Sequence, residues 1–194
     1  MIRWPSDLDA AARAFRSARP FAHVIIDDAL EAGQLARMAA SFGEEPQLLI
    51  ENEIYLHLRS SEPPVTRPLR DFCAALQASC ATVARLCGQP LSRADGSAYA
   101  YLPGHYLLPH SDSRKSEGRA VAYAFYVGAP EAGGALELFE CERRDDQIVR
   151  TKPVQRIEAR ANRLVLFEVH DFALHQVCEV LKGARTSIAG WFYP

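Results

Sequence analysis

The triplet His110-Ser111-Asp112 has the residue types and the spacing of a metal-binding pair. On a β-strand, side chains two residues apart point to the same face, so His110 and Asp112 can hold one ion together. Imidazole nitrogen and carboxylate oxygen form the mixed donor set of a facial triad, which binds Fe(II) and leaves coordination positions open. Open positions suit a bidentate oxo acid and dioxygen. The triplet therefore predicts part of an iron centre for oxygenase chemistry.

The third ligand of such a centre has to come from elsewhere in the chain, and His175 is the best candidate. It follows the triplet at a distance that allows several intervening strands. His170 is a weaker candidate, because choosing it would leave the next strand without a ligand. His23 and His57 fall in the half of the chain that is expected to be mainly helical, outside the β region, and His105 follows a Pro-Gly turn. A His-x-Asp triplet alone is a weak signal, so the prediction depends on strand context and on a nearby arginine.

That arginine is Arg185, expected on the strand after His175. A dicarboxylate such as 2-oxoglutarate would chelate iron through its keto-acid end, and its far carboxylate would then need a fixed cation. Arginine suits this role because its planar fork binds carboxylate with two parallel hydrogen bonds. Ser187 lies two residues on, hence on the same face, and could add a hydrogen bond. A lone strand arginine is more often a surface ion-pair partner, but its small or apolar neighbours at 186–190 favour an inward position.

The elements that must position these side chains divide the chain into two halves, 1–90 and 91–194. The first half is expected to be mainly helical and to support the second. Its predicted elements are helices at 7–16, with Asp7 as a cap, at 31–42 and at 68–86, a strand at 21–27 and an edge strand within 48–58.

The second half has the pattern of short strands separated by Gly and Pro turns. The predicted strands are 97–102, 106–109, 120–127, 135–139, 147–151, 163–169, 176–181 and 186–193. Short strands at this spacing favour a barrel or jelly roll. We expect the helical half to pack on one face of it, so that residues 1–194 form a single α+β domain.

Composition narrows the classes of partner and compartment. The net charge of −2 and the pI near 6.3 offer no basic surface for nucleic acid. No run approaches the ~18 apolar residues of a membrane-spanning helix. The first residues do not resemble a signal peptide, so a cytoplasmic protein without a membrane partner is expected.

The five cysteines contain no CxxC pair. Cys73, Cys80 and Cys87 are spaced by seven, which on a helix places them along one buried stripe. Buried core cysteines in a reducing compartment are favoured over a redox or metal role.

The segment from Tyr101 to Trp191 resembles the 2-oxoglutarate/Fe(II)-dependent oxygenases, and most of all their prolyl-hydroxylase branch. The matching segments are 101–104, 106, 110–112, 119, 126, 133–139, 162–167, 175–180 and 185–192. Residues 20–30 are similar to the opening of ribosomal-protein prolyl hydroxylases, whose second domain is not expected here. The resemblance implies a double-stranded β-helix (jelly-roll) core with N-terminal supporting helices.

The resemblance also implies roles for individual residues. His110, Asp112 and His175 match the iron ligands. Arg185 matches the residue that pairs with the 5-carboxylate of 2-oxoglutarate, and Ser187 matches a hydroxyl that assists it.

Further matches concern the walls of the site. Tyr101 and Tyr126 match tyrosines that lie against the co-substrate, and Leu136 matches an apolar wall of its pocket. Arg119 and Trp191 match positions that line the substrate proline in some members. The structural alternatives for these two are a surface position for Arg119 and a core position for Trp191.

The implied activity is a dioxygenase reaction, in which 2-oxoglutarate is converted to succinate and carbon dioxide while the substrate is hydroxylated. Fe(II), 2-oxoglutarate and dioxygen are required, and ascorbate is expected to be supportive. We predict a prolyl residue of a protein or peptide as substrate, rather than a nucleic acid. Two alternatives stay open: hydroxylation of a free small molecule, such as an amino acid or a biosynthetic intermediate, and a non-catalytic metal-binding sensor. The intact triad with Arg185 argues against the sensor.

Overall fold

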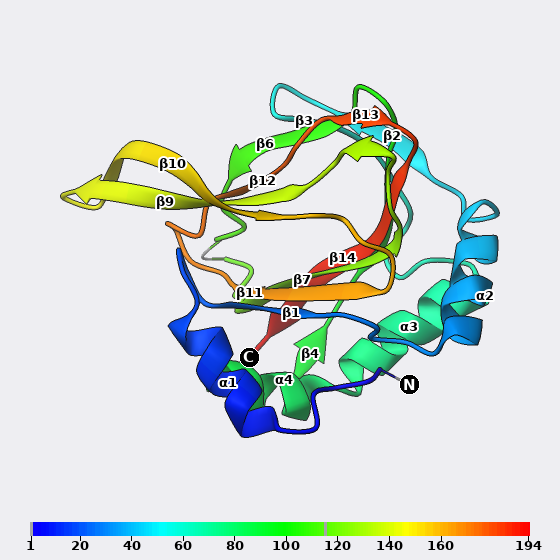
Figure 1. Ribbon diagram of the computed structural model, residues 1–194, viewed down its shortest axis with the longest axis horizontal. Coiled ribbons are helices and arrows are strands. Elements are labelled where there is room, and N and C mark those ends of the chain that lie inside the picture. The colour runs from blue at the N-terminus through cyan, green and yellow to red at the C-terminus, as the bar shows by residue number, and fades with distance from the viewer. Residues whose placement is uncertain (1, 115) are drawn as a thin grey trace.

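A computed structural model describes residues 2–114 and 116–194 of the chain. In this part of the chain, four helices lie along one side of a large curled antiparallel sheet (Figure 1). The predicted α+β class with a jelly-roll core is confirmed.

The described residues contain no helix with the length and apolar character that a bilayer crossing requires.

The four helices all come from the first half of the chain. They are α1 (Leu8–Ser17), α2 (Ala32–Phe42), α3 (Arg67–Gln77) and α4 (Cys80–Cys87). The carboxylate of Asp7 caps α1 as predicted, because it accepts a hydrogen bond from the Ala10 amide at 2.8 Å.

The prediction of one long helix over 68–86 is wrong, because the helix is interrupted at Ser79, between α3 and α4. The Ser79 hydroxyl donates to the Ala75 carbonyl at 2.7 Å and accepts from the Trp4 indole at 3.3 Å. A serine side chain that bonds back to the preceding turn competes with the regular helical pattern. Cys73 therefore lies on a different helix from Cys80 and Cys87, so the three do not form one stripe of a single helix. Cys80 is buried, and the other two are partly buried against the same core.

Three strands also come from the first half, which makes the predicted division at residue 90 less sharp. They are β1 (His23–Ile26), β2 (Leu48–Glu51) and β3 (Tyr55–Arg59). The predicted edge strand within 48–58 is a β2–β3 hairpin, whose turn is held by Asn52. Within this hairpin, β3 is an interior strand, since it pairs with β5 and β6.

The second half supplies the remaining strands. They are β4 (Arg93–Ala94), β5 (Ser97–Tyr101), β6 (Tyr106–His110), β7 (Val121–Gly128), β8 (Ala132–Gly133), β9 (Leu136–Arg144), β10 (Gln147–Ile157), β11 (Arg163–Glu168), β12 (His175–Val177), β13 (Val180–Lys182) and β14 (Arg185–Tyr193). The predicted strand 176–181 is two strands, β12 and β13.

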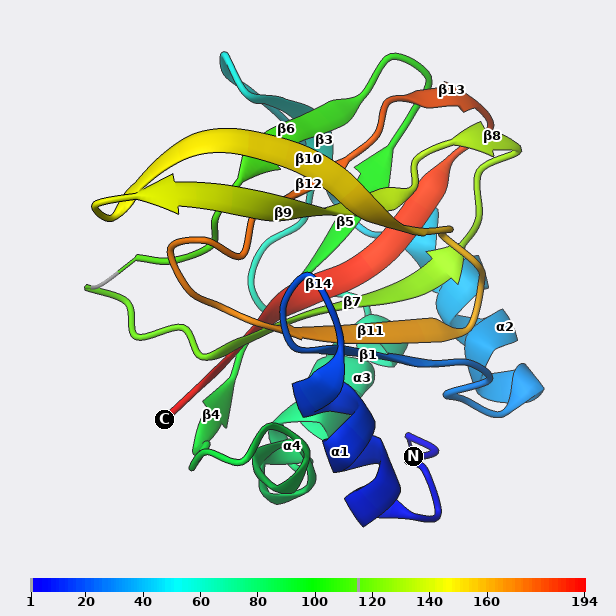
Figure 2. The ribbon, with the colours of Figure 1, turned by 60° about the vertical axis from the view of Figure 1, so that its left-hand side comes forward.

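The main sheet runs in the order β1-β11-β7-β14-β5-β3-β6-β12-β9-β10 and curls into two facing layers. Figure 2 shows β6, β12, β9 and β10 above β14, β7, β11 and β1, with α1, α3 and α4 beneath the lower layer and α2 at its side. The β9–β10 hairpin extends beyond the layers (Figure 1). Its outer strand β10 ends the sheet order and has a register shift between Pro153 and Gln155.

The core occupies both faces of the lower layer. Phe125 on β7 packs on Phe72 of α3 with ring centroids 4.5 Å apart, within the cluster between sheet and helices. Ala124 and Tyr126 point to the opposite face and join Leu136 in a second cluster between the two layers. Because both faces of β7 are buried, its sequence is a nearly continuous apolar run. The space between the layers contains the candidate site.

Candidate active site

In the described chain, His110, Asp112 and His175 bring together donor atoms that could hold a metal ion, and we call these three residues the metal-like cluster. His110 ends β6, and His175, the first residue of β12, pairs with it across the two antiparallel strands. Asp112 follows β6 by two residues. Its two carboxylate oxygens lie 3.4 Å from His110 Nε2 and 3.5 Å from His175 Nε2. One donor atom from each residue lies within 4.8 Å of the others, so a single ion can bridge all three.

The two imidazoles are oriented by backbone carbonyls. His110 Nδ1 lies 2.9 Å from the Leu108 carbonyl oxygen, and His175 Nδ1 lies 3.1 Å from that of Ala173. A carbonyl can only accept, so each Nδ1 carries the proton and each Nε2 presents its lone pair to the cluster. This second contact is the usual way in which a protein fixes the tautomer of a metal-binding histidine.

The protonation of the cluster also suits a divalent cation. Burial lowers the pKa of His175 to about 4, although the charge of Asp112 opposes that shift. Burial alone would raise the pKa of Asp112, but the neighbouring imidazoles of His175 and His110 hold it well below its usual range. At neutral pH the donors are therefore a neutral imidazole at His175 and a carboxylate at Asp112. Such nitrogen and oxygen donors fit Fe(II).

Arg185, the first residue of β14, is a buried cation at the far end of the same space. It is 3% exposed, and its guanidinium carbon lies 4.7 Å from the Tyr101 ring centroid and 5.0 Å from that of Tyr126. Within residues 2–114 and 116–194 it has no carboxylate within ion-pair distance.

Two buried polar atoms beside Arg185 also lack partners. They are its own Nε and the Tyr126 hydroxyl, and neither has a hydrogen bond within the described residues. Ser187, on the same face of β14, is buried as well. A buried charge without a partner is costly. The donors therefore fit an anionic ligand such as the distal carboxylate of a dicarboxylic acid.

One cavity of about 440 Å³ joins the metal-like cluster to Arg185. Leu136 and Tyr101 line it together with Ser187. Tyr126 lies against Arg185 rather than on the cavity surface. A second cavity, between α2 and α3, contains none of the predicted site residues.

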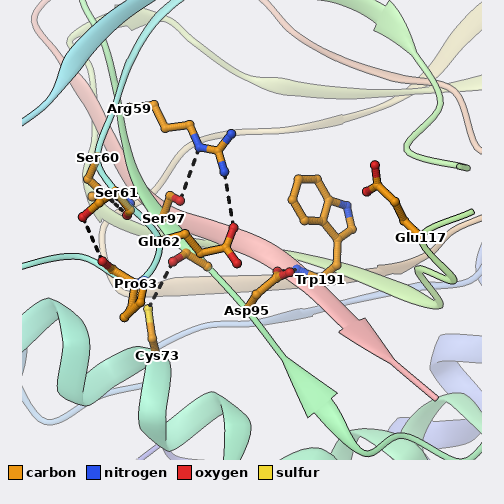
Figure 3. Close-up of polar contacts among 12 residues, drawn as sticks. Arg59, Ser60, Ser61, Glu62, Pro63, Cys73, Asp95, Ser97, Glu117 and Trp191 are labelled. Carbon is orange, nitrogen blue, oxygen red and sulfur yellow. Dashed lines mark hydrogen bonds and ion pairs between the residues drawn. The ribbon is translucent and has the colours of Figure 1, made fainter.

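Arg119 and Trp191 lie together on the same cavity wall. The Arg119 guanidinium carbon is 3.5 Å from the Trp191 ring centroid, and its NH2 group is 2.6 Å from Glu117. The Arg119 side chain is only 11% exposed, so the alternative of a surface position does not apply. Trp191 is partly buried and lines the cavity, near Asp95 and Glu117 in Figure 3.

A further wall of the cavity, formed by β3, contains side chains that sequence reasoning missed. Tyr55, His57 and Arg59 on β3 all face the cavity. Arg59 donates to the Ser97 hydroxyl at 3.3 Å and pairs with Glu62 at 3.4 Å (Figure 3). The alternation in 55–59, with leucines between these residues, is the period-two signal that could have identified this wall.

The other histidines considered from the sequence lie outside the metal-like cluster. The Nε2 atom of His170 is 3.1 Å from Glu168, and the His170 side chain does not line the cavity. His23 lies on β1 and contacts the Phe21 carbonyl. The structure thus brings His175, and not His170, beside the triplet.

Comparison with known proteins agrees with this chemistry. The sequence profile of the 2OG-Fe(II) oxygenase superfamily matches residues 96–193. Prolyl 3-hydroxylase OGFOD1 of Mus musculus is 37% identical over 92 residues, which cover 45% of this chain and 16% of that protein. The matched region is thus a small part of the curated relative.

Solved structures share the fold over almost the whole chain. A Pseudomonas putida prolyl-4-hydroxylase superposes with a TM-score of 0.73 at 19% identity, covering 94% of this chain and 98% of that one. The non-heme alpha ketoglutarate dependent epimerase SnoN from nogalamycin biosynthesis gives a TM-score of 0.75 at 14% identity, covering 98% and 84%. These likenesses concern the fold, and two different reactions occur on it.

Proposed function

The chain belongs to the 2OG-Fe(II) oxygenase superfamily, and we propose that it hydroxylates a prolyl residue of a protein or peptide. It is a dioxygenase that uses Fe(II) and 2-oxoglutarate. The observation that carries the proposal is the Arg119–Trp191 pair in the cavity that also contains the metal-like cluster.

His110, Asp112 and His175 would hold the iron through the donor atoms that already converge. Bound iron and 2-oxoglutarate supply the oxidation: dioxygen is consumed, 2-oxoglutarate becomes succinate and carbon dioxide, and one oxygen atom is added to the substrate. The protein's own share is to position these components and to exclude water.

Arg185 would pair with the far carboxylate of 2-oxoglutarate, assisted by the Ser187 hydroxyl. The rings of Tyr101 and Tyr126 lie against the guanidinium and keep the pair out of water, which strengthens it. Leu136 would form an apolar wall beside the methylene groups.

The substrate proline would pack on Trp191. A pyrrolidine ring is apolar and has no N–H to satisfy, so a partly buried indole suits it. Arg119 is held against that indole by its stacking contact and by Glu117. The Nε–H of Arg119 has no partner in the described chain, and the guanidinium can donate to a backbone carbonyl next to the proline.

Mass spectrometry of a proline-containing peptide library and a metabolite panel tests the proposal. Both are incubated with the protein, Fe(II), ascorbate and 2-oxoglutarate. We expect a mass increase of one oxygen atom on prolyl residues. The increase should be lost in Trp191→Ala and kept in Trp4→Ala, a matched control because Trp4 bonds Ser79 far from the cavity. Oxygen found on free metabolites, or on residues other than proline, would overturn the prolyl assignment in favour of the alternative.

We further propose that residues 1–194 form one oxygenase domain that works in the cytoplasm. The shared core between α3 and β7 supports the single domain. All five cysteines are free, as expected in a reducing compartment.

A further inference from the structure

The β3 strand brings three side chains into the cavity from outside the segment that matches the superfamily. It lies between β5 and β6 in the sheet order. Tyr55, His57 and Arg59 face the cavity, while Leu58 on the other face packs against the helical core. A strand at this position can contact a ligand held between the two layers.

His57 is the buried member of this row. It is 6% exposed, and its ring lies among Tyr55, Tyr99 and Tyr101 at centroid distances of 5.1, 5.4 and 5.2 Å. Its Nδ1 atom is buried without a hydrogen-bond partner in the described chain. Buried polar groups are nearly always paired, so an orphaned nitrogen beside a ligand cavity needs an explanation.

The ring of His57 is neutral at physiological pH. Burial, followed by the charges of Arg59, His105 and Arg185, lowers its pKa to about 4. A neutral imidazole has one N–H donor and one acceptor nitrogen. It can therefore donate one hydrogen bond to a ligand without placing a second charge beside Arg185.

Sheet register places His57 toward the Arg185 end of the cavity. Tyr101 pairs with Arg185 across β5 and β14. Leu58 pairs with Ala100 across β3 and β5, and the His57 ring packs on that of Tyr101. Arg59, by contrast, reaches Ser97 and Glu62, toward Trp191 (Figure 3). His57 thus belongs to the co-substrate end rather than to the substrate end.

We propose that His57 is a further co-substrate-binding residue, whose ring N–H donates a hydrogen bond to the distal carboxylate of 2-oxoglutarate. This rests on the proposed role of Arg185, because both residues would hold the same carboxylate. It does not depend on what the enzyme hydroxylates.

Anaerobic calorimetry on the full chain loaded with Mn(II) tests the proposal without any turnover. The variants are His57→Phe, which keeps a planar ring without nitrogen, and His57→Gln, which restores an N–H donor. His23→Phe is the matched control, a strand histidine outside the cavity. Each protein is titrated with 2-oxoglutarate and with 2-oxovalerate, which lacks the distal carboxylate.

We expect His57→Phe to weaken 2-oxoglutarate binding by about tenfold or more, the scale of one hydrogen bond to a charged group. Binding of 2-oxovalerate should stay unchanged. His57→Gln should recover part of the loss, and His23→Phe should bind as the unmodified chain does.

Three outcomes would overturn the assignment. If His57→Phe weakens the binding of 2-oxoglutarate and of 2-oxovalerate equally, His57 only packs the pocket. If His57→Phe changes the binding of neither ligand, His57 is not part of the site. If the unmodified chain does not prefer 2-oxoglutarate to 2-oxovalerate, the role of Arg185 fails and that of His57 fails with it. A non-prolyl substrate would leave all of these titrations unaffected, so the two proposals fail separately.

Discussion

The two walls of the cavity differ in how the chain encodes them. One part of the lining, which we call the first wall, combines the metal-like cluster of one layer with Arg185 and Trp191 of the other, and lies within the segment that matches the superfamily, 96–193. The other wall is β3 with the loop after it, and lies outside that segment. Short motifs encode the first wall, whereas strand pairing with distant residues creates the second. The first wall therefore indicates the reaction, and the second is where features particular to this chain can enter.

Removing a proposed metal ligand from the first wall should have the largest effect. Asp112→Ala takes away the carboxylate that lies between the two histidines. We expect succinate production to fall to background while the far-ultraviolet circular dichroism stays unchanged. Asp171→Ala is the control, since that carboxylate lies outside the cavity and contacts Ser113. Near-normal succinate production by Asp112→Ala with iron would remove Asp112 from the proposed triad.

The buried arginine of the first wall should give the next effect. Arg185→Ala should weaken 2-oxoglutarate binding by about 2–5 kcal/mol, by analogy with buried charge pairs that lose one partner. Anaerobic calorimetry measures the loss directly. An unchanged dissociation constant would place the dicarboxylate elsewhere.

Arg163 provides the matched control, because Asp27 already supplies its carboxylate at 2.7 and 3.0 Å. Arg163→Ala should leave 2-oxoglutarate binding unchanged.

Trp191→Phe should have a smaller effect, confined to the substrate. A smaller ring with less packing surface should raise KM for a prolyl peptide by roughly tenfold, on the scale of ~1 kcal/mol of lost aromatic contact. The dissociation constant of 2-oxoglutarate should stay the same, because Arg185 lies at the other end of the cavity. Steady-state kinetics, with Trp4→Phe as control, measures the effect on the peptide separately from that on 2-oxoglutarate. A parallel loss of 2-oxoglutarate affinity in Trp191→Phe would contradict the assignment of Trp191 to the substrate alone.

The smallest effects should be opposite pH dependences at two glutamates. Burial, together with the charge of Asp95, raises the pKa of Glu62 beside the second wall. Burial alone would raise the pKa of Glu137 on β9. Hydrogen bonds from Gln176 and Arg156 outweigh this effect, so the pKa of Glu137 is lowered. Because the pKa of Glu62 is raised in the folded protein, ionised Glu62 lowers the free energy of unfolding at pH values above the ordinary pKa of a glutamate. Because the pKa of Glu137 is lowered, ionised Glu137 increases the free energy of unfolding in the same pH range.

Glu62→Gln should therefore stabilise the protein slightly at pH 7, and Glu137→Gln should destabilise it. Both differences should shrink as the pH falls through the range in which these carboxyls become protonated. Urea unfolding at a series of pH values measures them. Changes of the same sign in both variants would contradict the contrast.

Sequence patterns were sufficient where function depends on short-range spacing. Arg185 and Ser187 share a face of β14 because they are two residues apart. His110 and Asp112 are equally close in the sequence, although Asp112 lies just beyond the end of β6. Patterns were insufficient where a distant contact decides the local structure. The contacts of Ser79 with Ala75 and Trp4 divide the predicted 68–86 helix.

His57 was set aside for a similar reason. The pattern places it in the helical half, whereas β5 and β6, whose paired residues lie roughly forty to fifty positions further along, pair with its strand and make it interior. The burial of Arg119 is also a tertiary outcome, produced by the Trp191 ring and Glu117. Local alternation indicates a strand, but it does not reveal which neighbours will cover it.

The β9–β10 hairpin has a consequence for self-association. Its outer strand ends the sheet order of the described chain, and it exposes Val149 and Val154. An exposed, apolar sheet edge is a template for pairing with another molecule. Pro153 has no N–H to donate and lies at the irregularity in the β9–β10 register, and Arg150 and Lys152 place like charges on the same strand. These features oppose edge-to-edge aggregation, so the hairpin can extend into solvent without recruiting further copies of the chain.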